Sequence, residues 1–151
     1  MERDIFDCTP LHWAVMEGYE NVVKLLLEMV MVDVNLTDSS GVTLLSLAVM
    51  QGREGMVKLV LETRTVDGNL AGSNGVTPLS LAAVEVHKAI VKLLLQRGDV
   101  GLTAQDSRGR TALSWAAEQG YSAVVKLLLE SENLDVNLED LEIGHHFRGL
   151  R

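Results

Sequence analysis

Apolar positions recur along the chain with a fixed spacing of 34 residues. Each recurrence contains two apolar stretches, a short one that opens with a threonine and a longer one that follows after a turn. The opening threonines are Thr9, Thr43, Thr77 and Thr111, and the longer stretches occupy residues 22–27, 56–61, 90–95 and 124–129. A period of this length is typical of stacked repeats, in which no unit can bury its apolar face alone. The chain is therefore expected to form a linear array of similar small units.

Each unit predicts a pair of short helices. The threonine hydroxyl can cap free backbone N–H groups, and the proline that follows Thr9 and Thr77 suits the first helical position. The second helix carries apolar residues on more than one stripe, so it should face both its partner and a neighbouring unit. The first helix is expected to end at a glycine in the left-handed conformation, at Gly18, Gly52 and Gly120.

The segments between units combine Asp, Asn, Ser and Gly, as in residues 32–41, 73–75 and 106–109. These residues favour tight turns and hairpins, so each unit should project a hairpin-like loop. Helices as short as these are marginal in isolation, and only stacking between units can hold them.

The stretch Thr9-Pro10-Leu11-His12-Trp13-Ala14 carries the hallmark T-P-L-H-x-A of the ankyrin repeat. Later copies are similar but altered, with Ser46, Ser80 and Ser114 in place of the histidine and Leu44 and Ala112 in place of the proline. The chain resembles ankyrin arrays over residues 4–140, and the sequence of its repeats is similar to that of the arrays of filamentous fungi. The resemblance implies an all-α ankyrin-repeat solenoid of helix-turn-helix units, joined by β-hairpin-like loops, with a non-catalytic role in protein binding.

We expect one ankyrin-repeat domain over residues 1–151. The expected divisions are a partial N-terminal hairpin at 1–8, repeats at 9–42, 43–76, 77–110 and 111–140, and a tail or partial cap at 141–151. Neither end carries an evidently polar capping repeat, which an isolated array normally needs. The chain is therefore either a piece of a longer array or one whose ends are covered by a partner.

The third unit departs from the pattern. Val86 stands where the other units place glycine, so either a strained left-handed conformation is kept or the turn changes shape. Gly101 replaces the counterpart of Asp33, and Thr103 that of Asn35. Local softness is predicted over residues 86–104.

Composition narrows the possible roles. The formal net charge of −8 disfavours nucleic acid, whose phosphates require clusters of Lys and Arg. The single Cys8 excludes an intramolecular disulfide and suits a reducing, cytoplasmic compartment. The strongest apolar region, residues 22–34, is interrupted by charges, so no membrane span is expected. Asn35-Leu36-Thr37 matches a glycosylation acceptor, but these residues belong to the repeat's own linker.

The resemblance implies that a protein or peptide partner binds the concave face, made of hairpin tips and first helices. By register this face would hold a strip of apolar residues that ends at charged ones. The alternative is that Ile5, Phe6 and Met16 are simply core residues exposed by truncation. The candidate partner-binding residues are Phe6, Met16, Glu17, Ser40, Val42, Met50, Gln51, Asn74, Val76, Val84, Glu85, Arg108, Arg110, Glu118 and Gln119.

Other recurring positions have structural interpretations. Trp13 and Trp115 share the register of Leu47 and Leu81, which predicts a place in the core. The lysines of the second helices, at residues 24, 58, 92 and 126, should form a solvated face.

Few residues in the sequence suggest catalysis or metal binding. Cys8 and His12 could pair as nucleophile and base near a helix start, but the histidine already belongs to the repeat hallmark. Glu142, His145 and His146 could ligate a metal, although neighbouring histidines in a tail lack a fixed second shell. We therefore expect no enzyme activity, cofactor or metal site. The alternative function is a structural or self-assembly module, or a fragment of a larger multi-domain ankyrin protein, that stacks through its open ends. We expect the protein to be a monomer or to self-associate weakly through uncapped ends.

Overall fold

The computed structural model describes residues 3–29 and 31–131, and these residues form four pairs of helices. In chain order the helices are α1 (Pro10–Glu17), α2 (Glu20–Leu27), α3 (Leu44–Met50), α4 (Glu54–Glu62), α5 (Pro78–Val84), α6 (Lys88–Gln96), α7 (Ala112–Glu118) and α8 (Ser122–Glu130).

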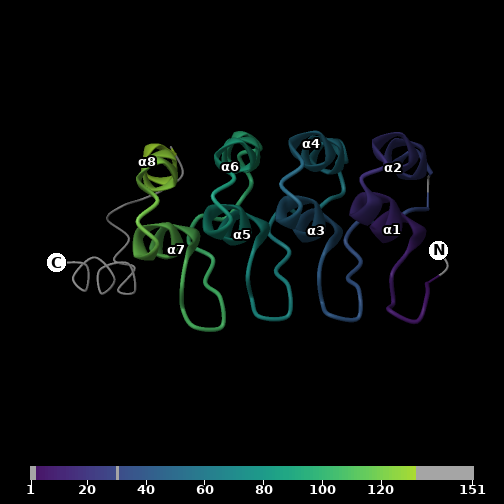
Figure 1. The fold of residues 1–151 in the computed structure, drawn as a ribbon, viewed down its shortest axis with the longest axis horizontal. Helices are drawn as coiled ribbons and strands as arrows, with labels where there is room; N and C mark the ends of the chain where they lie inside the picture. Colours follow the sequence, from purple (N-terminus) through teal and green to yellow (C-terminus); the bar gives the residue numbers. More distant parts are fainter. Residues whose placement is uncertain (1–2, 30, 132–151) are drawn as a thin grey trace.

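The pairs stand side by side in chain order and form two helical layers (Figure 1). One row holds α1, α3, α5 and α7, the inner helices, and the other holds α2, α4, α6 and α8, the outer helices. Long loops project from the inner row, away from the outer helices (Figure 1). Each helix contacts its partner and its counterpart in the next pair. Within the described part of the chain there is no strand, only an isolated bridge between Thr37 and Thr43. The predicted all-α solenoid of helix-turn-helix units is thus confirmed.

The repeated threonines occupy equivalent places. Each is the N-cap of an inner helix, is buried, and accepts a hydrogen bond from the amide three residues later. These amides belong to His12, Ser46, Ser80 and Ser114, at donor–acceptor distances of 3.3, 3.0, 3.2 and 3.1 Å. In α1 and α7 the side chain of the third residue also accepts from the threonine amide, which completes a capping box. In α7, Ser114 therefore replaces the hallmark histidine in this local role.

The turn after each inner helix has the left-handed residue predicted from the glycines. Gly18, Gly52 and Gly120 have φ values of 78°, 65° and 74°. Val86 keeps the same conformation, with φ at 60°, so the substitution strains the backbone instead of changing the turn.

The loops share one turn geometry as well. Residues 4–8, 38–42, 72–76 and 106–110 each close with a hydrogen bond from the first amide to the fifth carbonyl, at 2.9–3.1 Å. The described part of the N-terminal segment, from Arg3, therefore contains the same turn as the loops between units.

Two asparagines tie successive loops together. The Asn35 amide group donates to the carbonyl of Thr65 at 2.8 Å and accepts from the amide of Asp67 at 2.7 Å. Asn69 repeats the arrangement one unit later, donating to the carbonyl of Asp99 and accepting from the amide of Gly101. The side-chain nitrogen of the apparent glycosylation acceptor is thus already engaged within the fold.

Candidate functional site

The six apolar candidates lie at the loop tips and at the ends of the inner helices, and none of them is buried. Phe6 is 56% exposed and Met50 is 41% exposed. The remaining four are half-buried: Met16, Val42, Val76 and Val84. By contrast Val15 and Val49, each next to a candidate methionine, are fully buried. The inner helices thus turn one residue of each adjacent pair toward the core and the other toward the loop-side surface.

Backbone contacts between successive loops order the tips. The amide of Ser39 donates to the carbonyl of Phe6 at 2.9 Å, and that of Ser107 donates to the carbonyl of Asn74 at 3.0 Å. Between these two contacts, the Ser73 hydroxyl donates to the carbonyl of Ser40 at 2.8 Å. Three of the candidates therefore lie at equivalent, mutually braced positions along the row of loops.

Most of the polar candidates are exposed, namely Glu17, Ser40, Asn74, Glu85, Arg108, Glu118 and Gln119. Gln51 and Arg110 are half-buried and have partners within the fold. The Gln51 side-chain amide donates to the carbonyl of Met16 at 2.6 Å, which joins α3 to α1. Gln51 thus contributes to the stacking of units, in addition to any contact with a partner.

Arg110 belongs to a compact cluster with Asp106 and Trp115. Its guanidinium carbon lies 3.4 Å from the centroid of the Trp115 ring, and its Nε lies 3.2 Å from Asp106 Oδ2. The indole Nε1 of Trp115 donates to the same carboxylate oxygen at 3.1 Å. The arginine is therefore held by a salt bridge and a cation–π contact, and it is a less mobile candidate than exposed Arg108.

The carboxylate of Asp106 is stabilised in its charged form. Burial by itself would raise its pKa, but the amides of Arg110 and Arg108, the indole of Trp115 and the Arg110 guanidinium outweigh that effect. The pKa of Asp106 therefore lies below its ordinary value. Asp4 has the same arrangement with the amides of Phe6 and Cys8 and the indole of Trp13, and its pKa is also lowered against the effect of desolvation.

The prediction that both tryptophans lie in the core is wrong for Trp13 and only partly right for Trp115. Trp13 is 40% exposed and Trp115 is half-buried, because both rings lie toward the preceding loop, where an aspartate takes the indole N–H. Leu47 and Leu81 at the same register are half-buried and pack against the core. An aspartate nine residues before each tryptophan is the sequence signal that could have revealed the pairs.

The environment of Cys8 and His12 opposes thiol catalysis. Burial raises the pKa of the Cys8 thiol, and the charges of Asp4 and Asp38 raise it further, so the reactive thiolate is disfavoured. The Nδ1 of His12 lies 2.9 Å from the Thr9 hydroxyl, within the capping box. Burial lowers the pKa of His12, and the charge of Asp38 and the Leu36 backbone only partly counteract this effect.

In residues 3–29 and 31–131, no group of three His, Cys, Asp or Glu side chains could hold a metal ion. Glu142, His145 and His146 lie outside the described residues, as does the expected tail or cap at 141–151. Among the described helices, none has the length and apolar character needed to cross a bilayer.

A model of a known protein family matches almost the entire chain. Residues 1–71 and 64–140 match the family model described as ankyrin repeats (3 copies). A search of curated proteins returned no match. The match agrees with the helix pairs, the threonine N-caps and the projecting loops found in the fold. The chain therefore belongs to the ankyrin repeat family.

Proposed function

We propose that this protein is a non-catalytic scaffold that binds a protein or peptide partner on the concave face formed by its loop tips and inner helices. Ankyrin repeats generally mediate protein–protein interactions. The observation that carries the proposal is the partial exposure of apolar side chains on this face. Met50 is 41% exposed although the adjacent Val49 is fully buried, so the methionine is not needed to complete the core.

The strip has the chemistry expected of a recognition surface. Phe6, Met16 and Met50 offer apolar area, and methionine side chains adapt to irregular partners. At the other end of the row lie exposed Arg108 and the restrained Arg110. An apolar peptide segment followed by acidic residues would match both parts, since each region would meet a complementary group.

The rigidity of the face supports binding without a large ordering cost. Successive loops are joined by backbone hydrogen bonds, such as the one from the Ser39 amide to the Phe6 carbonyl. A preformed surface loses little conformational entropy on docking. We further propose that the protein acts in the cytoplasm, because its one cysteine, Cys8, is a buried free thiol, as is common in reducing compartments.

The test compares quantitative capture of partners from a cell extract by the native chain and by a Met16→Ala/Met50→Ala/Val84→Ala variant. We expect the variant to lose the specific partner while its urea unfolding midpoint changes little. A matched control, Val49→Ala, removes a fully buried side chain from the residue next to Met50. It should lower the free energy of unfolding by about 1–3 kcal/mol and leave binding by the remaining folded protein intact.

Two results would contradict the proposal. Equal capture by the native chain and the triple variant would show that the apolar strip is not part of the binding surface. A triple variant as unstable as Val49→Ala would show that these residues belong to the core.

A further inference from the structure

The N-terminal end of the helical array exposes a continuous apolar stripe. On α2 and just after it, Val22, Leu25 and Met29 are 43%, 65% and 54% exposed, and Leu26 is half-buried. Residues spaced by three and four positions share one face of a helix, so these four side chains lie together. We call this stripe the α2 end face.

The same register is buried in the other units. The counterparts of Val22 are Met56, Ile90 and Val124, and none of them is more than 1% exposed. These residues lie on α4, α6 and α8, each of which contacts the outer helix of the preceding unit. The α2 end face is therefore an inter-unit surface that lacks the neighbour present everywhere else in the described array.

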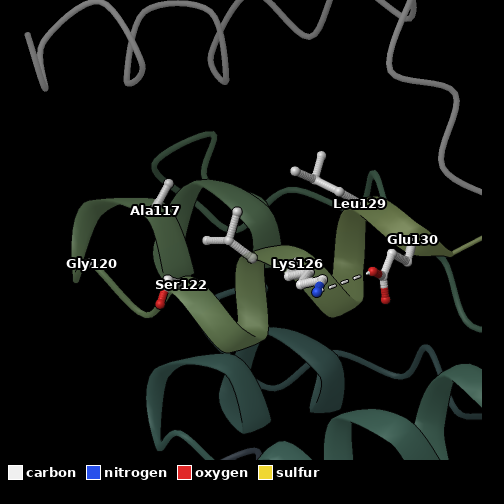
Figure 2. A pocket seen from close by; sticks show the side chains of 7 residues that line it. Ala117, Gly120, Ser122, Lys126, Leu129 and Glu130 are labelled. Atoms are coloured by element: carbon white, nitrogen blue, oxygen red, sulfur yellow. Dashed lines mark ion pairs between the residues drawn. The ribbon is translucent and has the colours of Figure 1, made fainter.

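The opposite end of the array has a matching hollow. An open groove of about 440 Å³ is lined by residues of α7, α8 and the turn between them, including Ala117, Val125 and Leu129 (Figure 2). Lys126 and Glu130 form an ion pair at 3.9 Å in its lining (Figure 2). We call this hollow the α8 groove.

The groove, too, is an inter-unit surface without its neighbour. The counterparts of Val125 are Val23, Val57 and Val91, and all three are 0% exposed. Val125 itself is only half-buried, and Leu129 is 40% exposed. In the interior, the outer helix of the following unit covers this surface.

A smaller feature fits the same pairing. The space beside Gly18 is taken by the Arg53 side chain, and an imidazole atom of His87 lies 2.7 Å from where a Cβ on Gly52 would be. Beside Gly120 nothing lies within 4 Å of that position. Tyr19, 58% exposed, has the register of Arg53 and His87, so a second α2 end face would bring its ring to the open space.

We propose that the α2 end face of one molecule packs into the α8 groove of a second copy of this chain, which continues the array head to tail. Both surfaces are in the register of the three interfaces already present between units, so each presents apolar residues at the positions that pack together inside the array. Such a contact is heterologous and does not close, so it produces open chains of increasing length. It uses surfaces other than the concave face, and either proposal can fail without the other.

Charge sets the conditions for association. The net charge of −8 repels a second copy, and added salt screens that repulsion while leaving apolar contacts intact. The mean mass of the full chain, measured by sedimentation or light scattering, should therefore rise with protein concentration. It should rise further when NaCl is increased.

The decisive test uses two variants that each block one surface. Leu25→Glu places a charge on the α2 end face, and Leu129→Glu places one in the α8 groove; both side chains are exposed, so folding should be preserved. Each variant alone should raise the dissociation constant roughly tenfold or more. An equimolar mixture should form one-to-one heterodimers, because each variant keeps the surface that the other has lost.

Lys58→Ala is the matched control, because it changes the net charge by the same single unit. Lys58 is exposed and lies on α4, away from both ends of the array. It should associate like the native chain. A full chain that stays monomeric at every concentration and salt level would overturn the proposal. A mixture of the two blocked variants that remains monomeric would also overturn it.

Discussion

The indole Nε1 of Trp115 donates a hydrogen bond to Asp106 Oδ2 at 3.1 Å, joining the inner helix α7 to the loop that precedes it. The same carboxylate accepts from the amides of Arg108 and Arg110, each at 2.9 Å. One buried side chain thus holds the shape of a loop and attaches that loop to the helical layer. Asp4 and Trp13 form the corresponding pair at the first inner helix, at 2.7 Å.

Replacing Asp106 by alanine should therefore destabilise the fourth unit. The loss of several hydrogen bonds to one charged acceptor should lower the free energy of unfolding by about 2 kcal/mol, as measured by urea denaturation. Glu85→Ala, which removes an exposed acid, serves as the control and should change stability little. Equal effects of the two substitutions would mean that the Asp106 cluster contributes nothing beyond its charge.

Stability should fall in mild acid because of His12. Burial lowers its folded-state pKa below the ordinary value of 6.5, so the unfolded chain binds a proton that the folded chain does not. The stabilisation is complete above pH 6.5 and is lost as the pH falls toward the lower folded-state pKa. Comparing urea midpoints at pH 7.5 and at about pH 5.5 measures this loss.

His12→Ser is the informative variant, because Ser114 already completes the same capping box in α7. The variant should keep its N-cap and lose the part of the pH dependence that His12 causes. A serine variant with the native slope between the two pH values would assign that slope to other groups.

Val86→Gly should stabilise the third unit. Val86 has a φ of 60°, a left-handed conformation that is strained for any residue with a Cβ. Its side chain is 46% exposed, so little packing is lost when it is removed. We expect a gain of about 1 kcal/mol in the free energy of unfolding. Gly52→Ala should act in the opposite sense, because φ there is 65° and the added Cβ would meet the His87 ring. A neutral or destabilising Val86→Gly would show that the local strain is small.

Asn69→Ala should loosen the contact between the second and third loops. The substitution removes both the donor to the Asp99 carbonyl and the acceptor for the Gly101 amide, and should cost about 1 kcal/mol. Hydrogen exchange should then increase at Gly101. Thr103, the exposed residue at the equivalent register, provides the control, and Thr103→Ala should have little effect. Unchanged exchange at Gly101 would contradict the role assigned to Asn69.

Most of the fold could be read from local patterns. The four threonines became N-caps, and three glycines took the left-handed turn, as the 34-residue period predicted. Each of these features depends on hydrogen bonds or backbone angles within a few residues, and short sequence motifs encode such interactions directly. The position of the candidate partner surface was likewise expected from register, and its role in binding remains a prediction.

The solvent exposure of individual side chains could not be predicted from these local patterns. Val22 and Met56 occupy the same register and are both apolar, yet one is 43% exposed and the other is fully buried. Trp13 was expected in the core, but an aspartate on the neighbouring loop holds its ring at the surface. The Gln51 side chain donates a hydrogen bond to a carbonyl 35 residues away in the sequence, and no local motif predicts this partner.

The chain's pattern alone was thus sufficient for its repeats, helix ends and turns, because these arise from contacts between residues close in sequence. Which apolar side chains are covered, how the loops are joined, and which surfaces remain open at each end depended on the packing of one unit against another. Burial is a property of the neighbour as much as of the residue, so it emerges only when the units are stacked.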